Sequence, residues 1–269
     1  MIEPPSIYGN TQETMETLAQ LVKRSKKRLL QMHFESGVGH LGGNLSCLDT
    51  LMVLYHKVLG SDDLFILSKG HSAGALYITL WSKDVLTEND LKSFHKDDTI
   101  LSAHPPPQKI NAIPFATGSL GHGFPLSVGL ALGRKLRKQP GRVFCLMSDG
   151  EWEEGSNWEA LLFSVHHGLD SLILILDWNG FQGFGSTQEV AGLSSITEKL
   201  HSFGLEVEEI DGHNLESIEK SLSRLIPGPR AIIAHTTKGQ GISFMENKME
   251  WHYLTMSEVQ YQQALEEIG

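Results

Sequence analysis

The stretch from residue 143 to residue 185 most constrains what this chain can fold into, because it predicts two strands joined by a helix. Residues 143–147 and 172–176 are short apolar runs of the kind found in buried parallel strands, and residues 153–167 between them have helical spacing. Parallel strands joined by a right-handed crossover end at the same edge of a sheet, where open α/β sheets bind ligands. The stretch therefore predicts a ligand site at that edge.

Polar residues follow each of these two strands. Asp149 and Gly150 come after the first, and Asn179 comes after the second, 30 residues beyond Asp149 (179 − 149). A carboxylate and an amide oxygen suit Mg²⁺, which takes its remaining ligands from phosphates and water. Gly150 would let a diphosphate approach the backbone, next to the N-terminus of the following helix. Asp-Gly and Asn-Gly are also ordinary turn sequences, so this pair alone does not decide between a turn and a metal site.

The rest of the chain predicts one α/β domain. Further apolar runs at residues 64–67, 206–210 and 231–234 alternate with helical patterns, which indicates a doubly wound, mostly parallel sheet flanked by helices. We expect an extended N-terminal arm at residues 1–10 and a single domain over residues 11–269.

Two features of the N-terminal region shape that expectation. A helical pattern begins at residue 11 and ends at Gly37, and its Lys and Arg residues between 23 and 28 suit a solvated face. Residues 39–43 are too rich in glycine to favour a helix, so we expect a turn there and a second helix over residues 46–59.

Composition excludes several classes of protein. The net charge of −10 argues against a nucleic-acid surface. No apolar run approaches the roughly 20 residues of a membrane span, and no signal-peptide pattern is present. Cys47 and Cys145 both lie in apolar segments, which favours a reducing compartment without a disulfide. We therefore expect a cytoplasmic protein that binds neither nucleic acid nor membrane.

Five of the 13 histidines lie in loops flanked by glycine or proline, or near the ends of predicted elements. Any one of them could be a surface or structural residue. Together at one edge of a sheet they would suit proton transfer near neutral pH, because histidine titrates there. They are His40, His71, His104, His122 and His252.

The ordered set of motifs resembles the N-terminal, diphosphate-binding half of the transketolase family. The motifs are Ser-Gly-x-Gly-His, Ser-x-Gly-His, a His-Pro loop, Thr-Gly-x-Leu-Gly-x-Gly, Asp-Gly-x-x-x-Glu-Gly, Asn, Lys-Gly-x-Gly and Trp-His, and the resemblance covers about residue 11 to residue 252. The family's thiamine diphosphate signature is Gly-Asp-Gly, then about thirty residues, then Asn. Ser148 replaces the first glycine here, and both metal-ligand positions remain.

The resemblance implies a set of site residues. Asp149, Asn179 and the backbone carbonyl of Phe181 would hold Mg²⁺ or another divalent cation such as Ca²⁺. His40, His104 and His252 would contact substrate oxygens, and Glu154, with Glu159, matches acidic positions between the two cofactors of a dimer. The residues implied for thiamine diphosphate are His71, Gly118, Ser119, Leu120, Gly121, Asp149, Gly150, Asn179, Lys238 and His252.

The resemblance also implies a missing half, because a one-chain transketolase is much longer and completes its site from a second domain. We therefore expect the N-terminal subunit of a split transketolase, paired with a separate C-terminal subunit in an α2β2 complex. It would transfer a two-carbon ketol unit from a ketose, or its phosphate, to an aldehyde. Two alternatives stay open, namely the α subunit of a 2-oxoacid decarboxylase or dehydrogenase and a non-catalytic binding or regulatory paralogue.

Overall fold

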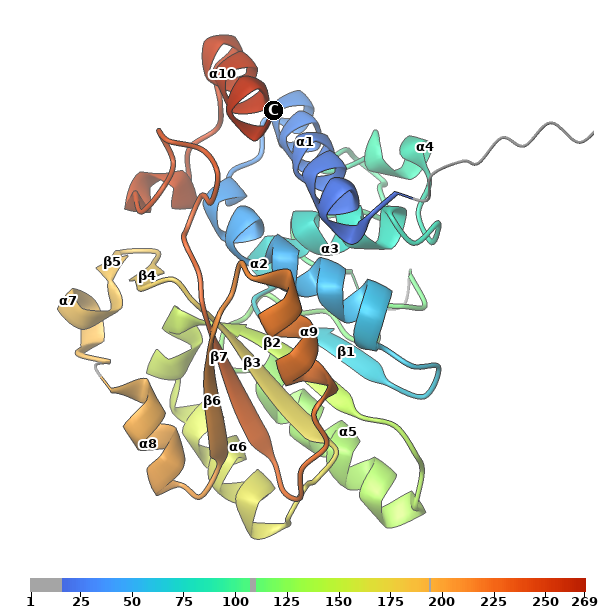
Figure 1. Ribbon diagram of the computed structural model, residues 1–269, viewed down its shortest axis with the longest axis vertical. Helices are drawn as coiled ribbons and strands as arrows, with labels where there is room; N and C mark the ends of the chain where they lie inside the picture. Colours follow the sequence, from blue (N-terminus) through green and yellow to red (C-terminus); the bar gives the residue numbers. More distant parts are fainter. Residues whose placement is uncertain (1–15, 107–109, 194) are drawn as a thin grey trace, which may run out of the picture.

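The computed structural model describes residues 16–106, 110–193 and 195–269, and a five-stranded parallel sheet lies at its centre (Figure 1). The expected arm at residues 1–10 lies outside these residues. The strand order is β1-β2-β3-β7-β6, and every pairing in this sheet is parallel. The strands are β1 Leu64–Leu67, β2 Val143–Ser148, β3 Leu172–Trp178, β6 Glu206–Asp211 and β7 Arg230–His235. The parallel α/β fold predicted from the sequence is confirmed.

Helices cover both faces of the sheet (Figure 1). Alternate side chains of β2 enter different cores: Phe144 and Leu146 pack in one, and Val143, Cys145 and Met147 in the other. This division follows from the two-residue period of a strand. The first core includes α1 Leu18–Ser36, α2 Leu41–Val53, α3 Ala73–Trp81 and α9 Leu215–Ser223, and the second includes α5 Gly123–Arg137, α6 Gly155–His166 and α8 Ile196–Ser202.

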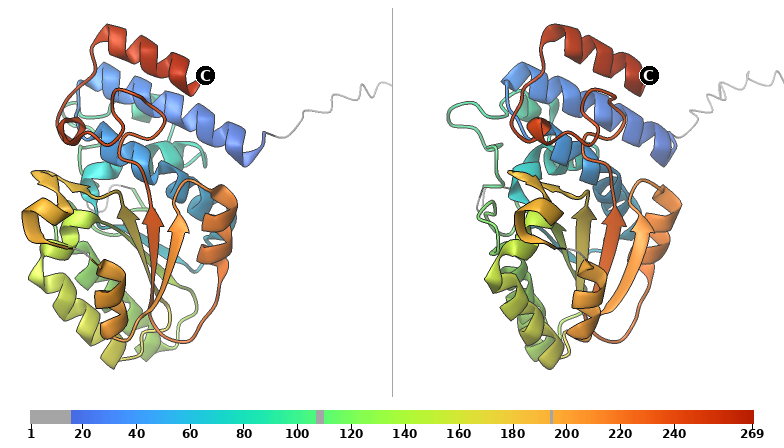
Figure 2. Two further views of the ribbon diagram at one scale, coloured as in Figure 1. Left: turned by 60° about the vertical axis from the view of Figure 1, so that its left-hand side comes forward. Right: turned by 90° about the vertical axis from the view of Figure 1, so that its left-hand side faces the viewer.

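Helices α1 and α10, Glu258–Ile268, lie side by side on the far side of α2 and α3 from the sheet (Figure 2). The rings of Phe34 and Tyr261 stack between them with centroids 4.4 Å apart. The short helix α4, Glu88–Leu91, follows the N-cap Thr87, whose hydroxyl accepts a hydrogen bond from Asp90 N. No helix among the described segments is long and apolar enough to cross a membrane.

The turn expected at residues 39–43 is wrong, because α2 begins at Leu41 and includes Gly42 and Gly43. A Cβ on Gly42 would lie 3.1 Å from Lys238 Cγ, and one on Gly43 would lie 3.5 Å from Ser72 Oγ. Glycine therefore serves close packing here, and tertiary contacts outweigh its low helix propensity. The helix also stops before the expected residue 59, passing at residue 54 into the π-helix Leu54–Val58.

The expected solvated basic face of α1 is also only partly correct. Lys26 and Arg28 are each 8% exposed. Lys26 pairs with Asp49 at 3.0 Å, and Arg28 pairs with Glu88 at 3.0 Å. A helical face counted from the sequence cannot show that acidic residues of α2 and α4 approach it.

Several short elements near the sheet edge escaped the sequence analysis. Residues Asp149–Glu153 form a 3₁₀ helix, so Gly150 lies in that turn and not at the N-terminus of α6. The strands β4, Phe181–Gln182, and β5, Gly185–Ser186, form a small hairpin, and α7, Thr187–Ala191, follows it. Trp251 and His252 belong to the 3₁₀ helix η4, Met249–His252.

Candidate active site

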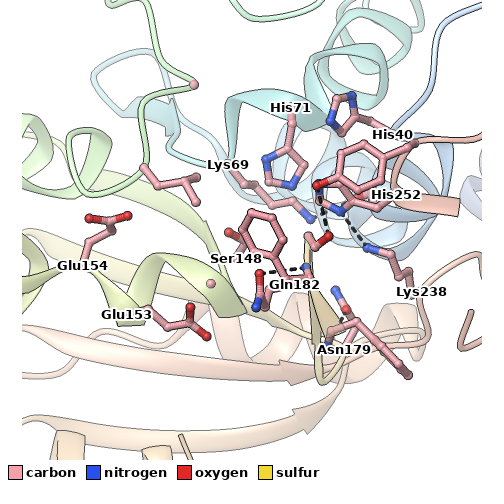
Figure 3. Close-up of a pocket in the computed structure, with 18 of the residues that line it drawn as sticks. His40, Lys69, His71, Ser148, Glu153, Glu154, Asn179, Gln182, Lys238 and His252 are labelled. Atoms are coloured by element: carbon pink, nitrogen blue, oxygen red, sulfur yellow. Dashed lines mark hydrogen bonds between the residues drawn. The ribbon is translucent and has the colours of Figure 1, made fainter. Parts of the chain in front are cut away.

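A pocket of about 330 Å³ opens at the carboxyl edge of the sheet, where β1, β2, β3 and β7 end (Figure 3). Most of the residues expected in the site line it. They are His40, His71, His104, Gly118, Leu120, Gly150, Glu154, Asn179, Phe181, Lys238 and His252. Segments as distant as residues 40 and 252 meet here because α2, η4 and the strand ends converge on one edge.

The predicted pairing of Asp149 with Asn179 is confirmed as a contact. Ser148 is in register with Asp177 on the neighbouring strand, so the residues that follow lie together. Asn179 N donates to Asp149 Oδ2 at 3.1 Å, and Asn179 Oδ1 accepts from Phe181 N at 3.2 Å. Asp149 is fully buried, and its Oδ1 has no hydrogen-bond partner within the described structure. Burial, together with the charge of Asp177, raises the pKa of Asp149 to about 8.

Two buried lysines line the same pocket. Lys238 is 2% exposed, and burial together with the charge of Lys69 lowers its pKa to about 8. Lys69 is 1% exposed and forms an ion pair with Asp177. Burial opposes the charge of Lys69, but Asp177 raises its pKa overall. Both side chains therefore carry positive charge near neutral pH, and they suit an anionic ligand.

Four of the five predicted histidines gather on one side of the pocket. The ring centroid of His40 lies 5.6 Å from that of His71, 6.3 Å from that of His104 and 5.0 Å from that of His252. Burial lowers the pKa of all four, to about 4 for His40 and about 3 for His252. The cluster is therefore neutral near pH 7, and its rings can donate or accept hydrogen bonds.

The tautomer of His252 follows from its neighbour. Lys238 Nζ lies 3.3 Å from His252 Nδ1, shown by a dashed line in Figure 3. An ammonium group can only donate, so Nδ1 accepts and the ring proton of the neutral imidazole lies on Nε2. His252 thus presents an N–H donor to a ligand in the pocket.

The glycine-rich loop at residues 117–121 closes another side. Thr117 Oγ1 donates to the carbonyl of Leu67 at 2.6 Å, which fastens the loop to the end of β1. Gly118 has a φ of +128°, and a Cβ there would lie 2.4 Å from Cδ2 of His104. Glycine is thus required for both the backbone conformation and the approach of His104.

Five of the candidate site residues named from the sequence do not line the pocket. Asp149 lies directly behind it, and Gly121 is buried beneath Glu154, whose Cβ would be 2.8 Å from a Cβ on Gly121. Ser119, His122 and Glu159 are exposed outside it. His122 occupies the N-cap position of α5 without a side-chain capping bond, and its Nδ1 lies 3.1 Å from the carbonyl of Leu120, so it does not join the other four histidines.

Other lining residues were given no role from the sequence. Lys69 had a usable signal, because it follows β1 directly in Ser-Lys-Gly-His, and Tyr253 follows His252. The hairpin residues had no such signal, because a two-residue strand leaves too short a pattern to read. The lining residues without an assigned role are Gly43, Lys69, Ser148, Glu153, Gln182, Gly183, Phe184 and Tyr253.

Known proteins resemble this chain over nearly its whole length. It is 35% identical over 267 residues to an apulose-4-phosphate transketolase subunit of Phocaeicola vulgatus, covering 95% of each protein. It is 34% identical over 255 residues to the 6-deoxy-6-sulfo-D-fructose transketolase subunit SqwG of Clostridium sp., covering 90% of this chain and 93% of that one. The solved transketolase of Campylobacter jejuni superposes with a TM-score of 0.83 at 27% identity, over 93% of this chain and 43% of that chain. The chain thus spans about two-fifths of the length of that enzyme.

The fold and the pocket define a class: an α/β domain with a lysine-lined pocket at the carboxyl edge of a parallel sheet, the edge where such folds bind ligands. Within that class the chain belongs to the transketolase family, because residues 23–269 match the family model "Transketolase, thiamine diphosphate binding domain". It corresponds to the N-terminal part of these transferases, which confirms the family expected from the sequence motifs. The relatives favour this interpretation over the 2-oxoacid decarboxylase or dehydrogenase.

The residues present fit a diphosphate and a divalent cation. Lys69 and Lys238 provide positive charge for phosphate oxygens. The unpartnered oxygen of Asp149 provides a hard ligand for a cation, which would remove the cost of burying that carboxylate. No group of three or more His, Cys, Asp or Glu side chains in the described segments is placed to hold a metal by itself. A cation here would therefore depend on amide, carbonyl and phosphate oxygens as further ligands.

Proposed function

We propose that this chain is the N-terminal subunit of a split transketolase. It would transfer a two-carbon ketol unit from a ketose, or its phosphate, to an aldehyde. The observation that carries the proposal is the convergence of four neutral histidines and two buried lysines in one pocket, whose lining residue Asn179 donates a hydrogen bond to the buried Asp149. A non-catalytic paralogue would have no need to keep this costly set of buried groups together.

Three oxygen ligands are proposed for the cation: a carboxylate oxygen of Asp149, the amide oxygen of Asn179 and the backbone carbonyl of Phe181. Mg²⁺ is the preferred ion and Ca²⁺ the alternative, because both take oxygen ligands. The support is the contact between Asp149 and Asn179, and the turn that brings Phe181 N to the amide of Asn179.

Thiamine diphosphate, when bound, would supply the carbanion chemistry, while the protein binds and orients the cofactor and the substrate. We assign the diphosphate end to Asp149, Gly150, His71 and Lys238. His252 would bind both the cofactor and substrate. The glycine-rich loop would line the rest of the cofactor site through Gly118, Ser119, Leu120 and Gly121, beside the metal ligand Asn179.

The histidines would handle substrate oxygens and protons. His40, His104 and His252 are neutral, so each can donate one N–H to a carbonyl or hydroxyl oxygen and accept at the other nitrogen. His252 would donate through Nε2, because Lys238 occupies Nδ1. Glu154 lines the same pocket, and we propose that it acts near the cofactor at the contact between two assembled sites.

A separate C-terminal subunit would complete the site, in an α2β2 complex. The support is that relatives named as transketolase subunits match this chain nearly end to end, whereas the solved transketolase of Campylobacter jejuni is covered over 43% of its length. We propose that residues 11–269 act as one domain in that complex. The cytoplasm remains the proposed location, since both cysteines are free and buried.

Reconstitution tests the function. The chain is purified with its partner, and the mass of the assembly, bound thiamine diphosphate and ketol transfer are measured with and without a chelator. We expect a stoichiometric complex whose transfer activity is lost on chelation and restored by Mg²⁺. Turnover of pyruvate instead of a ketose would favour the 2-oxoacid alternative. A complex that binds no cofactor would overturn the proposal in favour of the non-catalytic one.

Replacing His252 with alanine should lower transfer activity sharply. The change removes an N–H donor aimed into the pocket, and such donors contribute about 100-fold to rate. The thermal unfolding temperature should stay close to wild type, because His252 is only partly buried. His201→Ala, on the exposed surface of α8, is the matched control and should keep full activity. Unchanged turnover in His252→Ala would contradict the assigned role.

A further inference from the structure

A second polar cluster lies behind the active site, between α1, α2 and the start of α9. Its centre is Asp49, which is 2% exposed. Asp49 Oδ1 lies 3.0 Å from Lys26 Nζ, and Oδ2 lies 2.8 Å from His213 Nδ1. These groups line a cavity of about 290 Å³ that is separate from the cofactor pocket. None of them is needed for the chemistry assigned above, so their arrangement requires its own explanation.

The contacts of His213 specify its tautomer. Thr237 N lies 2.8 Å from His213 Nε2, and a backbone N–H can only donate, so Nε2 accepts. The ring proton is therefore on Nδ1, where it faces the carboxylate of Asp49. The imidazole thus connects a buried carboxylate of α2 to the backbone of the segment after β7. Carboxylate partners commonly fix a histidine's tautomer and orientation in this way.

That segment, residues 236–241, carries Lys238. The cluster contacts this segment at two points. His213 accepts a hydrogen bond from Thr237 N, and Lys26 Nζ donates to the side chain of Gln240. Two backbone hydrogen bonds also hold the segment: Gly239 N donates to the carbonyl of Gly42 at 2.9 Å, and Asn247 N donates to the carbonyl of Lys238 at 3.0 Å. The side chain of Lys238 lines the cofactor pocket and reaches His252. A shift of this segment would therefore move an ammonium group inside the pocket.

We propose that His213 is a positioning residue: with Asp49 it fixes residues 236–241 and so sets the place of Lys238 in the cofactor pocket. The inference rests on the proposed function, because it takes Lys238 as a ligand of the cofactor's diphosphate. His213 itself does not line the cofactor pocket; it lines the second cavity. It acts through the amide of Thr237, which directly precedes Lys238.

Two substitutions separate the contacts of His213. In His213→Gln the side-chain oxygen can take the place of Nε2 and accept from Thr237 N. In His213→Asn the amide nitrogen can take the place of Nδ1 and donate to Asp49, but nothing reaches Thr237. The proposal predicts that the glutamine variant keeps a fixed segment and the asparagine variant does not. A role confined to pairing with Asp49 predicts the reverse order.

Hydrogen exchange of the full chain measures how often the amides of residues 236–241 open to solvent. We expect amides in residues 236–241 to exchange about tenfold faster in His213→Asn, the effect of losing one buried hydrogen bond, and near the wild-type rate in His213→Gln. Equal exchange in the two variants, or faster exchange in His213→Gln, would overturn the proposal. Because this measurement needs no cofactor, it remains decisive even if the proposed function fails.

Cofactor affinity of the assembled complex tests the link to Lys238. His213→Asn should weaken thiamine diphosphate binding by about tenfold, the fold-change that corresponds to one lost hydrogen bond. In a Lys238→Ala background the same substitution should add little, because its route to the cofactor is gone. Equal losses in both backgrounds would overturn the route through Lys238. A wild-type complex without cofactor affinity would overturn the proposed function instead.

Discussion

Replacing Asp149 with asparagine should abolish Mg²⁺-dependent binding of thiamine diphosphate while leaving the chain at least as stable. The carboxylate is the only charged group among the proposed metal ligands. Even partners outside the metal's own ligand set change affinity by about 10- to 100-fold, so loss of this charge should weaken binding by at least about 100-fold. Titration calorimetry of the assembled complex, with and without Mg²⁺, measures the effect.

The stability half of this prediction follows from burial. Asp149 is fully buried, one oxygen lacks a partner within the described residues, and its pKa is raised to about 8. A neutral amide of the same shape should therefore not lower the thermal unfolding temperature measured without metal. Asp97→Asn, at an exposed position in the turn after α4, is the matched control and should change neither quantity. Unaltered Mg²⁺-dependent binding in Asp149→Asn would exclude Asp149 as a metal ligand.

The strands that build the site could be predicted because each is a short apolar run that ends in polar or glycine residues. Residues 143–147 and 172–176 became β2 and β3, and their parallel pairing placed Asp149 beside Asn179 as expected. The histidines were harder, since nothing in the local pattern distinguishes His122 from His104. Only the packing of the loop at residues 117–121 points the first outward and lets the second approach Gly118.

Errors arose where distant contacts outweigh local preference. The glycines at the start of α2 are helical because Lys238 and Ser72 approach them closely. The sequence of residues 39–43 does not indicate that these neighbours are present. The same is true of Lys26, whose burial depends on Asp49, 23 residues away. Lys69 and Asp177 are 108 residues apart, so no local pattern indicates that they form the buried ion pair beneath the site.

Replacing Asp177 with alanine should be the most destabilising change at the site. Lys69 and Asp177 are each 1% exposed, and Lys69 Nζ otherwise contacts only the carbonyl of Gly43, at 3.0 Å, among the hydrogen bonds of the described residues. The carboxylate also accepts from Ser46 Oγ at 2.6 Å and Thr236 Oγ1 at 2.5 Å. Removing it leaves a buried ammonium without its counterion, which costs about 3–5 kcal/mol. Chemical denaturation of the chain measures this free energy of unfolding.

The double substitution Lys69→Met with Asp177→Leu separates charge from packing. Once both charges are gone, no buried ion lacks a partner, and hydrophobic replacements of similar volume often restore stability. We therefore expect the double variant to be more stable than Asp177→Ala. Its affinity for the cofactor should stay low, because Lys69 supplies one of the two lysine charges lining the pocket. A double variant as unstable as Asp177→Ala would show that the hydrogen bonds of Ser46 and Thr236, and not the ion pair, hold this edge of the sheet together.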